Sequence, residues 1–222
     1  LAADGIAVPA LIETAAGRPL YREEDGRRQY LTLAGDYADI AVPDDAWTLA
    51  DKKRGQKPIT ANSSASLWDI GDGVACLEFH SKMNSLDNNS MAMVREAAKI
   101  DKRGFKALII GNDGTNFSVG ANVGLALFAA NTAMWPLLAQ NIKEGQDAYL
   151  ALKYAPFPVV GAPAGMALGG GCEVLLHCAA IQACAETYIG LVEVGVGLIP
   201  GWGGTKETVL RNVANKRRPG GP

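Results

Sequence analysis

Three consecutive glycines, Gly169 to Gly171, precede Glu173 at the junction between a loop and an apolar segment. Amide N–H groups at the start of a helix have no intrahelical acceptor, and the helix dipole favours negative charge there. Because glycine has no side chain, a ligand oxygen can come close to these amides. The segment therefore indicates an oxyanion hole with a carboxylate one turn further on. The alternative is a packing turn in which Glu173 is an ordinary first-turn charge.

Two other segments carry a similar signal. Glu193 is the single charge between Thr187 and Thr205, and a carboxylate in such surroundings is costly unless it is paired or used. The glycine-rich residues 111–122 follow an apolar strand at 106–110, and ligands of parallel sheets bind beyond the carboxyl ends of strands. This loop would give a second amide to the same oxygen. Each segment also has a plain alternative: a glutamate that caps a turn, and an ordinary connecting loop.

Four motifs, in the right order, resemble the crotonase (enoyl-CoA hydratase/isomerase) family over about residues 65–210. They are His-Ser-Lys-Met-Asn-Ser-Leu (80–86), Phe-Ser-Val-Gly-Ala-Asn (117–122), Ala-Leu-Gly-Gly-Gly-Cys-Glu (167–173), and Gly-Leu-Ile-Pro-Gly-Trp-Gly-Gly-Thr (197–205) with Glu193 shortly before it. One position departs from the family pattern, because Asn122 stands where the family has Asp. The match as a whole displaces the plain alternatives.

The resemblance implies a role for each motif. Glu173 and Glu193 correspond to the two acid/base glutamates of hydratases, with Glu173 expected as the base and Glu193 as the acid. The backbone N–H groups of Ala121 and Gly170 correspond to the oxyanion hole for a thioester carbonyl. The residues expected to line the substrate and CoA path are Lys82, Met83, Val119, Gly120, Asn122 and Gly169. No metal site is expected, since the chain has only two histidines.

Alternating strands and helices must position these motifs, and the sequence predicts an α/β fold. Strands are expected at residues 66–70, 74–79, 106–110, 157–162 and 188–191, and helices at 87–102, 124–153 (with a break at Pro136) and 172–177. A Gly-Asp-Gly turn joins the first two strands into a hairpin, and the later strand–helix–strand order implies parallel pairing. The resemblance implies a crotonase-like ββα spiral core, truncated before the C-terminal helices of the family and carrying an N-terminal extension.

The first 60 residues differ from the rest. Residues 21–28 are charge-dense and 29–33 have strand character, so a short strand or hairpin and then a connector are expected. The layout resembles bacterial proteins in which a 3-hydroxyacyl-CoA dehydrogenase precedes a hydratase-like domain. Residues 1–60 are therefore interpreted as the tail of the dehydrogenase and a connector, and residues 61–222 as the crotonase-like domain. The start at Leu1 and a polar, breaker-rich end at 215–222 indicate a piece of a longer protein.

Composition excludes several classes of protein. With 48% hydrophobic residues and a net charge of -2, a normal core and no general attraction to nucleic acid are expected. The four cysteines form no Cys-x-x-Cys pair and no secretory signal is visible, which favours the cytoplasm. Prolines and glycines interrupt the uncharged run from Tyr154 to Cys172, so no membrane span is expected. No Gly-x-Gly-x-x-Gly follows a strand; no cofactor is expected in this fragment, and NAD only in the missing upstream domain.

The resemblance implies hydration of 2-enoyl-CoA to 3-hydroxyacyl-CoA in fatty-acid β-oxidation, with an acyl-CoA thioester as the bound partner. One alternative is a double-bond isomerase, which in this family works with one glutamate at the position of Glu193. Glu173 argues for hydration, because an isomerase needs no second carboxylate to activate water. The other alternative is a non-catalytic acyl-CoA-binding module that supports the dehydrogenase, against which the intact pair of glutamates argues. A homo-oligomer is expected for the full-length protein.

Overall fold

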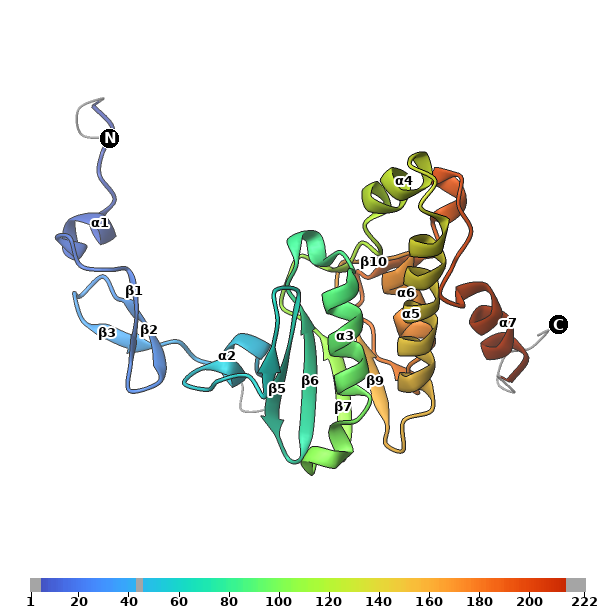
Figure 1. The fold of residues 1–222 in the computed structure, drawn as a ribbon. Helices are drawn as coiled ribbons and strands as arrows, with labels where there is room; N and C mark the ends of the chain where they lie inside the picture. Colours follow the sequence, from blue (N-terminus) through green and yellow to red (C-terminus); the bar gives the residue numbers. More distant parts are fainter. Residues whose placement is uncertain (1–4, 43–45, 215–222) are drawn as a thin grey trace. The chain divides into compact units, whose positions relative to one another are not determined.

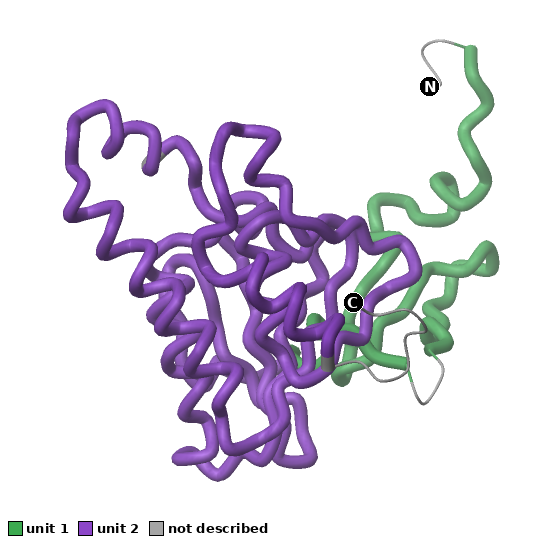
Figure 2. Tube along the Cα trace, turned by 90° about the vertical axis from the view of Figure 1, so that its right-hand side faces the viewer, with its two compact units in different colours: residues 1–54 green, residues 55–222 purple. Residues whose placement is uncertain are grey.

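The structure is a computed structural model of the 222-residue chain, and it describes residues 5–42 and 46–214. The chain forms two compact units, residues 1–54 and residues 55–222 (Figure 2). The breaker-rich end expected at 215–222 lies outside the described residues.

The first unit is built on an antiparallel sheet of three strands and two short helices (Figure 1). The strands are β1 (Tyr21–Glu24), β2 (Arg27–Leu31) and β3 (Tyr37–Asp39), and the helices are α1 (Ala10–Ala15) and α2 (Leu49–Lys53). Asp25 and Gly26 join β1 to β2 with φ angles of 51° and 74°, as a two-residue hairpin turn requires. The Arg22 guanidinium lies 3.8 Å from the centre of the Tyr37 ring. The expected strand or hairpin is thus part of a larger sheet.

The second unit contains a six-stranded sheet in the order β11-β9-β7-β6-β5-β4. Its strands are β4 (Thr60–Ala61), β5 (Ala65–Gly71), β6 (Val74–Phe79), β7 (Ala107–Gly111), β9 (Val159–Ala162) and β11 (Ala180–Ile181). The expected hairpin is present, because β5 and β6 pair antiparallel around a turn at residues 72 and 73. Strands β6, β7, β9 and β11 run parallel, as the strand–helix–strand order of the sequence predicts.

A second sheet of this unit is small and entirely parallel. Its strands lie in the order β12-β10-β8 and are β8 (Asn116–Ser118), β10 (Met166–Leu168) and β12 (Tyr188–Gly190). Because the strands are parallel, their carboxyl ends lie at one edge of the sheet. The chain leaves that edge into residues 119–122, 169–173 and 191–193. Of the three strands, the sequence predicted only β12.

Helices accompany the two sheets (Figure 1). They are α3 (Asn88–Ala97), α4 (Val123–Asn131), α5 (Trp135–Lys153), α6 (Gly170–Leu176) and α7 (Gly204–Ala214), with 3-10 turns η2 (Lys82–Asn84), η3 (Ile100–Arg103) and η4 (Glu193–Val196). Asp87 caps α3, since its carboxylate accepts from the Ser90 backbone N–H at 2.8 Å.

Three helix boundaries differ from the sequence prediction. The helix expected over 87–102 ends ten residues after its cap and continues only as the short η3. The stretch expected at 124–153 is two helices, but Pro136 lies in the first turn of α5, where proline is tolerated, and the break precedes it. Helix α6 begins at Gly170, two residues before the expected start.

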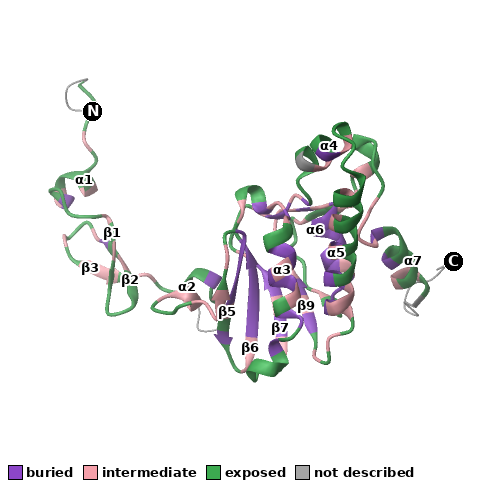
Figure 3. Ribbon diagram, in the orientation of Figure 1, coloured by how far each residue is buried: buried purple, intermediate pink, exposed green. Residues whose placement is uncertain are grey.

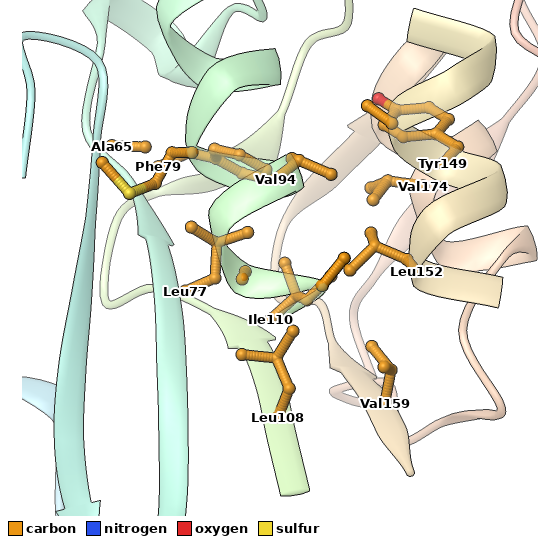
Figure 4. Packing of buried hydrophobic residues seen from close by; sticks show 14 of the residues in the cluster. Ala65, Leu77, Phe79, Val94, Leu108, Ile110, Tyr149, Leu152, Val159 and Val174 are labelled. Atoms are coloured by element: carbon orange, nitrogen blue, oxygen red, sulfur yellow. The ribbon is translucent and has the colours of Figure 1, made fainter. Parts of the chain in front are cut away.

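The core of the second unit lies between the six-stranded sheet and helices α3 and α5, where the buried strands show clearly in Figure 3. Figure 4 shows the packing, in which side chains of the sheet face Val94 on α3 and Tyr149 and Leu152 on α5. The sheet residues in that view are Ala65, Leu77, Phe79, Leu108, Ile110 and Val159. In the part of the chain that the structure describes, no helix is long and apolar enough to cross a membrane.

Candidate active site

Three loops meet at the carboxyl edge of the small parallel sheet. Leu168 at the end of β10 pairs with Gly190 at the end of β12, and the Gly169 N–H donates to the Gly190 carbonyl oxygen at 2.9 Å. On the other side of β10, Ala167 pairs with Ser118 at the end of β8. The three segments that the sequence singled out as carrying chemistry therefore start from adjacent points.

The loop after β8 is fixed from two sides. The Ser118 hydroxyl donates to the Asn84 carbonyl oxygen at 2.7 Å and accepts from the Gly120 N–H at 3.1 Å. The Leu86 N–H donates to the Gly120 carbonyl oxygen at 2.8 Å, and Leu86 and Ala121 form a parallel bridge. Two of the four family motifs are thus joined by backbone hydrogen bonding.

Gly120 and Gly170 bring the two expected oxyanion loops together. Gly120 has a φ of +86°, and a Cβ at this position would lie 2.8 Å from the Leu168 carbonyl oxygen and 3.0 Å from the Gly170 nitrogen. Only glycine permits such an approach at this backbone angle. Gly170 is the first residue of α6, so its N–H has no acceptor within the helix. Among the described residues, neither this amide nor that of Ala121 is hydrogen-bonded, and both can donate to a ligand oxygen.

Glu173 is held by two backbone amides. It lies in the first turn of α6, and only 2% of its surface is exposed. Its Oε1 accepts from the Trp202 N–H at 2.9 Å and from the Gly204 N–H at 2.8 Å. Gly204 is the first residue of α7, whose dipole favours a negative charge at this end. Both bonds end on the same oxygen, which leaves Oε2 for a water molecule.

Burial raises the pKa of the Glu173 carboxyl above its ordinary value. The two amide hydrogen bonds oppose this shift, and the nearby charge of Glu193 adds to it. A carboxylate with a raised pKa takes up a proton more readily, as a general base at neutral pH must.

Glu193 lies on the Gly169 side of the same site. It is the first residue of η4, and its Oε1 lies 3.2 Å from the place that a Cβ on Gly169 would occupy. Its Oε2 is buried and has no hydrogen-bond partner in the part of the chain that is described. The neighbouring Cys172 lies within reach of both carboxylates: burial, and then the charges of Glu173 and Glu193, raise the pKa of its thiol to about 11.

The structure places the remaining expected residues around this centre. Val119 is half-buried and Asn122 exposed, on either side of the loop that carries the Ala121 amide. Lys82 and Met83 lie in η2, and both side chains are exposed, with Met83 54% accessible and in a left-handed conformation at φ 56°. They are connected to the site through the backbone of their motif rather than through buried side chains.

Three contributors were not recognised from the sequence. The Trp202 and Gly204 amides belong to residues 197–205, which were noted only for their resemblance to the family. Their role was missed because it depends on the backbone and not on their side chains. Tyr149 is fully buried, its hydroxyl donates to the Gly170 carbonyl oxygen at 2.9 Å, and its ring lies edge-on to the Trp202 ring at 5.5 Å. The only feature that marks Tyr149 in the sequence is a polar aromatic residue within a helical stretch of mixed polarity. Among the residues that the structure describes, no group of three His, Cys, Asp or Glu could hold a metal.

The raised pKa of Glu173 predicts that Glu173→Gln is more stable than the natural protein at neutral pH. At low pH the carboxyl is protonated in both the folded and the unfolded chain, so the two proteins should have similar Tm values. As the pH rises past the ordinary glutamate pKa, the unfolded chain releases this proton more readily than the folded chain, and the natural protein alone loses stability. The measurement is Tm against pH for both proteins. A variant whose Tm is lower at neutral pH, or whose advantage is the same at every pH, would contradict this account.

Comparison with known proteins identifies the family. Residues 69–217 match the enoyl-CoA hydratase/isomerase family. The chain is 40% identical, over 199 residues, to a protein of Bacillus subtilis named "Probable 3-hydroxyacyl-CoA dehydrogenase", with 90% of this chain and 25% of the relative covered. It is 37% identical, over 144 residues, to the fatty acid oxidation complex subunit alpha of Idiomarina loihiensis, with 61% of this chain and 19% of the relative covered. The chain thus spans a quarter or less of the length of these relatives.

Solved structures agree with the fold. An enoyl-CoA hydratase from Bacillus anthracis is 22% identical with a TM-score of 0.61, covering 69% of this chain and 60% of that one. An enoyl-CoA hydratase from Polaromonas is 22% identical with a TM-score of 0.62, covering 67% of this chain and 58% of that one. The crotonase-like α/β fold expected from the sequence is therefore confirmed. With the match to the family over most of its length, the chain belongs to the enoyl-CoA hydratase/isomerase family.

Proposed function

We propose that this chain hydrates 2-enoyl-CoA thioesters to 3-hydroxyacyl-CoA, with Glu173 and Glu193 as its catalytic residues. The observation that carries the proposal is the unmatched oxygen of Glu193. A buried carboxylate oxygen without a partner costs free energy, and a water molecule or a substrate proton at that position removes the cost. This oxygen belongs to the same site as the free amides and the Glu173 carboxylate.

The reaction follows from these parts. The amides of Ala121 and Gly170 would bind the thioester oxygen, which gains negative charge as water attacks the β-carbon. Glu173 takes a proton from that water, and the water oxygen bonds to the β-carbon. The electron pair of the double bond moves to form an enolate. Glu193 then gives its proton to the α-carbon, so one water molecule is added in all. The raised pKa of Glu173 suits the part of base.

The remaining expectations belong to the same proposal. Lys82, Met83, Val119 and Asn122 line the path of CoA, with the glycines Gly120 and Gly169 leaving room for the acyl thioester. The names of the relatives support a longer fatty acid oxidation protein that also carries a 3-hydroxyacyl-CoA dehydrogenase with its NAD. The first 60 residues would then be the tail of that dehydrogenase and a connector. The whole protein would act in the cytoplasm as a homo-oligomer.

The test uses the ultraviolet absorption of the conjugated enoyl thioester. With crotonyl-CoA, hydration removes this absorption. With a 3-enoyl-CoA, double-bond isomerisation creates it. We expect the intact natural protein to consume crotonyl-CoA, and the acid side of its kcat/KM profile to fall through a pKa above the ordinary glutamate value, since the base form of Glu173 is lost there. If absorption rises with a 3-enoyl-CoA and does not fall with crotonyl-CoA, the activity is isomerisation and not hydration. If absorption changes with neither substrate, the chain is a binding module without catalytic activity.

A further inference from the structure

A cluster of charges around the buried Glu207 takes no part in the proposed chemistry. Glu207, on α7, has only 2% of its surface exposed. The Lys153 Nζ, at the end of α5, donates to both of its carboxylate oxygens at 2.7 and 2.8 Å, and the Lys206 Nζ lies 3.0 Å from Oε1. Burial alone would raise the pKa of Glu207, but the hydrogen bonds from Lys153 and Lys206 outweigh it and lower the pKa. The carboxylate is therefore charged at neutral pH.

Stability alone is a weak explanation for this ion pair. Burying the Glu207 charge costs about as much as its attraction to the partly exposed Lys153 returns, and apolar replacements of buried pairs are often neutral or stabilising. What an ion pair does provide is a fixed geometry between the elements that carry it. Here those elements are the end of α5 and the first turns of α7.

The start of α7 is the segment that holds Glu173. The Glu207 N–H donates to the Gly203 carbonyl oxygen at 2.9 Å, so the ion-paired residue lies one turn beyond the amides of Trp202 and Gly204. A shift of α7 relative to α5 and α6 would carry those two amides away from the Glu173 carboxylate.

One face of α5 supports this segment along its length. Gly145, Tyr149 and Lys153 are spaced four residues apart, which puts them on the same side of a helix. The Trp202 indole packs directly on Gly145, and its edge meets the Tyr149 ring. Next to this face, the Gln146 side-chain amide donates to the Gly201 carbonyl oxygen at 2.8 Å. Lys153 is the charged end of this row of contacts.

His177, the C-cap of α6, contacts both Glu173 and Glu207. Its Nδ1 lies 2.8 Å from the Glu173 carbonyl oxygen, and its Nε2 lies 3.7 Å from Oε1 of Glu207. Burial lowers the pKa of the imidazole, although the Glu173 carbonyl and the Glu207 charge act to raise it. The ring is therefore neutral at neutral pH, and Nδ1–H donates to the Glu173 carbonyl oxygen. Among the residues that the structure describes, Lys153 from α5, Lys206 from α7 and the His177 ring just after α6 are the groups that face the Glu207 carboxylate.

We propose that Lys153 and Glu207 are positioning residues, which hold the start of α7 against α5 so that the Trp202 and Gly204 amides stay on the Glu173 carboxylate. The inference rests on the proposed function, because it takes Glu173 to be the base. Losing the pair should leave the binding of acyl-CoA intact while the base is misplaced. Without the two amide donors, which lower its pKa, Glu173 would also bind its proton more tightly.

The test variants are Lys153→Met and Glu207→Gln in the intact natural protein, with crotonyl-CoA as substrate. We expect kcat to fall about 10- to 100-fold, as for a catalytic group misplaced by roughly an ångström. The KM should change little, and the acid limb of the rate profile should move to higher pH. Lys153→Arg keeps the charge and the donors and should retain most of kcat. The control is Lys143→Met, which removes an exposed ion pair with Asp147 from the same helix and should change neither kcat nor the limb.

Hydrogen exchange of the 201–204 loop gives a second measurement that needs no activity. Peptide-level exchange should speed up in this loop in both test variants, while the hairpin of β5 and β6 keeps its natural rate. If the test variants have a lower Tm but keep the kcat, the acid limb and the loop exchange of the natural protein, the pair is merely structural and the proposal is overturned. If the natural protein hydrates no enoyl-CoA, the proposed function fails, and the loop exchange alone decides the inference.

Single variants that leave one charge buried can fail to fold, so the double variant Lys153→Met/Glu207→Met completes the design. It leaves no buried charge of the pair unmatched, because Lys206 is half exposed and can turn to water. The proposal expects this folded double variant to show the same lowered kcat and faster loop exchange. Natural values of both would overturn it.

Discussion

Replacing Glu173 or Glu193 with glutamine is expected to lower kcat for crotonyl-CoA hydration about 10²–10⁴-fold, the usual contribution of a general acid or base. Glutamine fits the space, and at position 173 its side-chain oxygen can still accept hydrogen bonds from the Trp202 and Gly204 amides. It cannot take or give the proton. Acyl-CoA binding should survive, since the amides of the oxyanion hole are unchanged. The measurement is kcat for each variant beside the affinity of a saturated acyl-CoA that cannot be hydrated.

Glu186→Gln is the matched control for this pair. Glu186 is an exposed glutamate between the two catalytic positions in the chain, so it tests loss of charge without loss of the site. Its kcat should equal that of the natural protein. Natural turnover by either catalytic variant would remove that glutamate from the mechanism. A loss confined to Glu193→Gln would show that hydration in this chain needs a single glutamate.

Replacing Gly120 with alanine is expected to lower kcat about 10²–10³-fold, as loss of an oxyanion-hole donor does. The added methyl would lie 2.8 Å from the Leu168 carbonyl oxygen and 3.0 Å from the Gly170 nitrogen, so the two loops must move apart. That movement would separate the amides of Ala121 and Gly170. The measurement is kcat together with Tm, because part of the effect is strain from a φ of +86°.

Gly104→Ala isolates the strain. Gly104 has a φ of +88°, almost the same as Gly120, but nothing lies within 4 Å of the place where its Cβ would be. Both variants should therefore lose stability, and only Gly120→Ala should lose turnover. Equal kcat in the two variants would show that the approach of Gly120 to Gly170 is not needed for activity. Gly170 itself is a poorer test, because a Cβ there would meet the Trp202 ring at 2.5 Å and displace it.

The sequence predicted the elements with a strong local pattern and missed those without one. Strand β6 was predicted at its observed bounds because an apolar run of β-forming residues follows a glycine turn. Strands β8 and β10 align the site but were missed, although β12, of the same length, was predicted; three residues are too few for periodicity to decide either way. The two short helices of the first unit were missed for the same reason.

The candidate site was predicted as far as side chains mark it. Glu173 and Glu193 stand out because each is a lone carboxylate among apolar residues and glycines. The two hydrogen bonds that hold the Glu173 carboxylate could not be predicted. Their donors are backbone amides about thirty residues away in the sequence, and no pattern of side chains indicates such donors. Lys153 and Glu207 could not be predicted either, since a partly buried ion pair between two helices looks in the sequence like two surface charges.

The most direct test of the central claim is the fate of water itself. The intact natural protein should be incubated with crotonyl-CoA in water labelled with heavy oxygen, and the products separated and measured by mass spectrometry. The product should be a 3-hydroxyacyl-CoA that carries one heavy oxygen on its β-carbon, and Glu173→Gln or Glu193→Gln should form almost none of it. Crotonyl-CoA that stays unhydrated, or is converted without gaining oxygen, would contradict the assignment of this site to hydration.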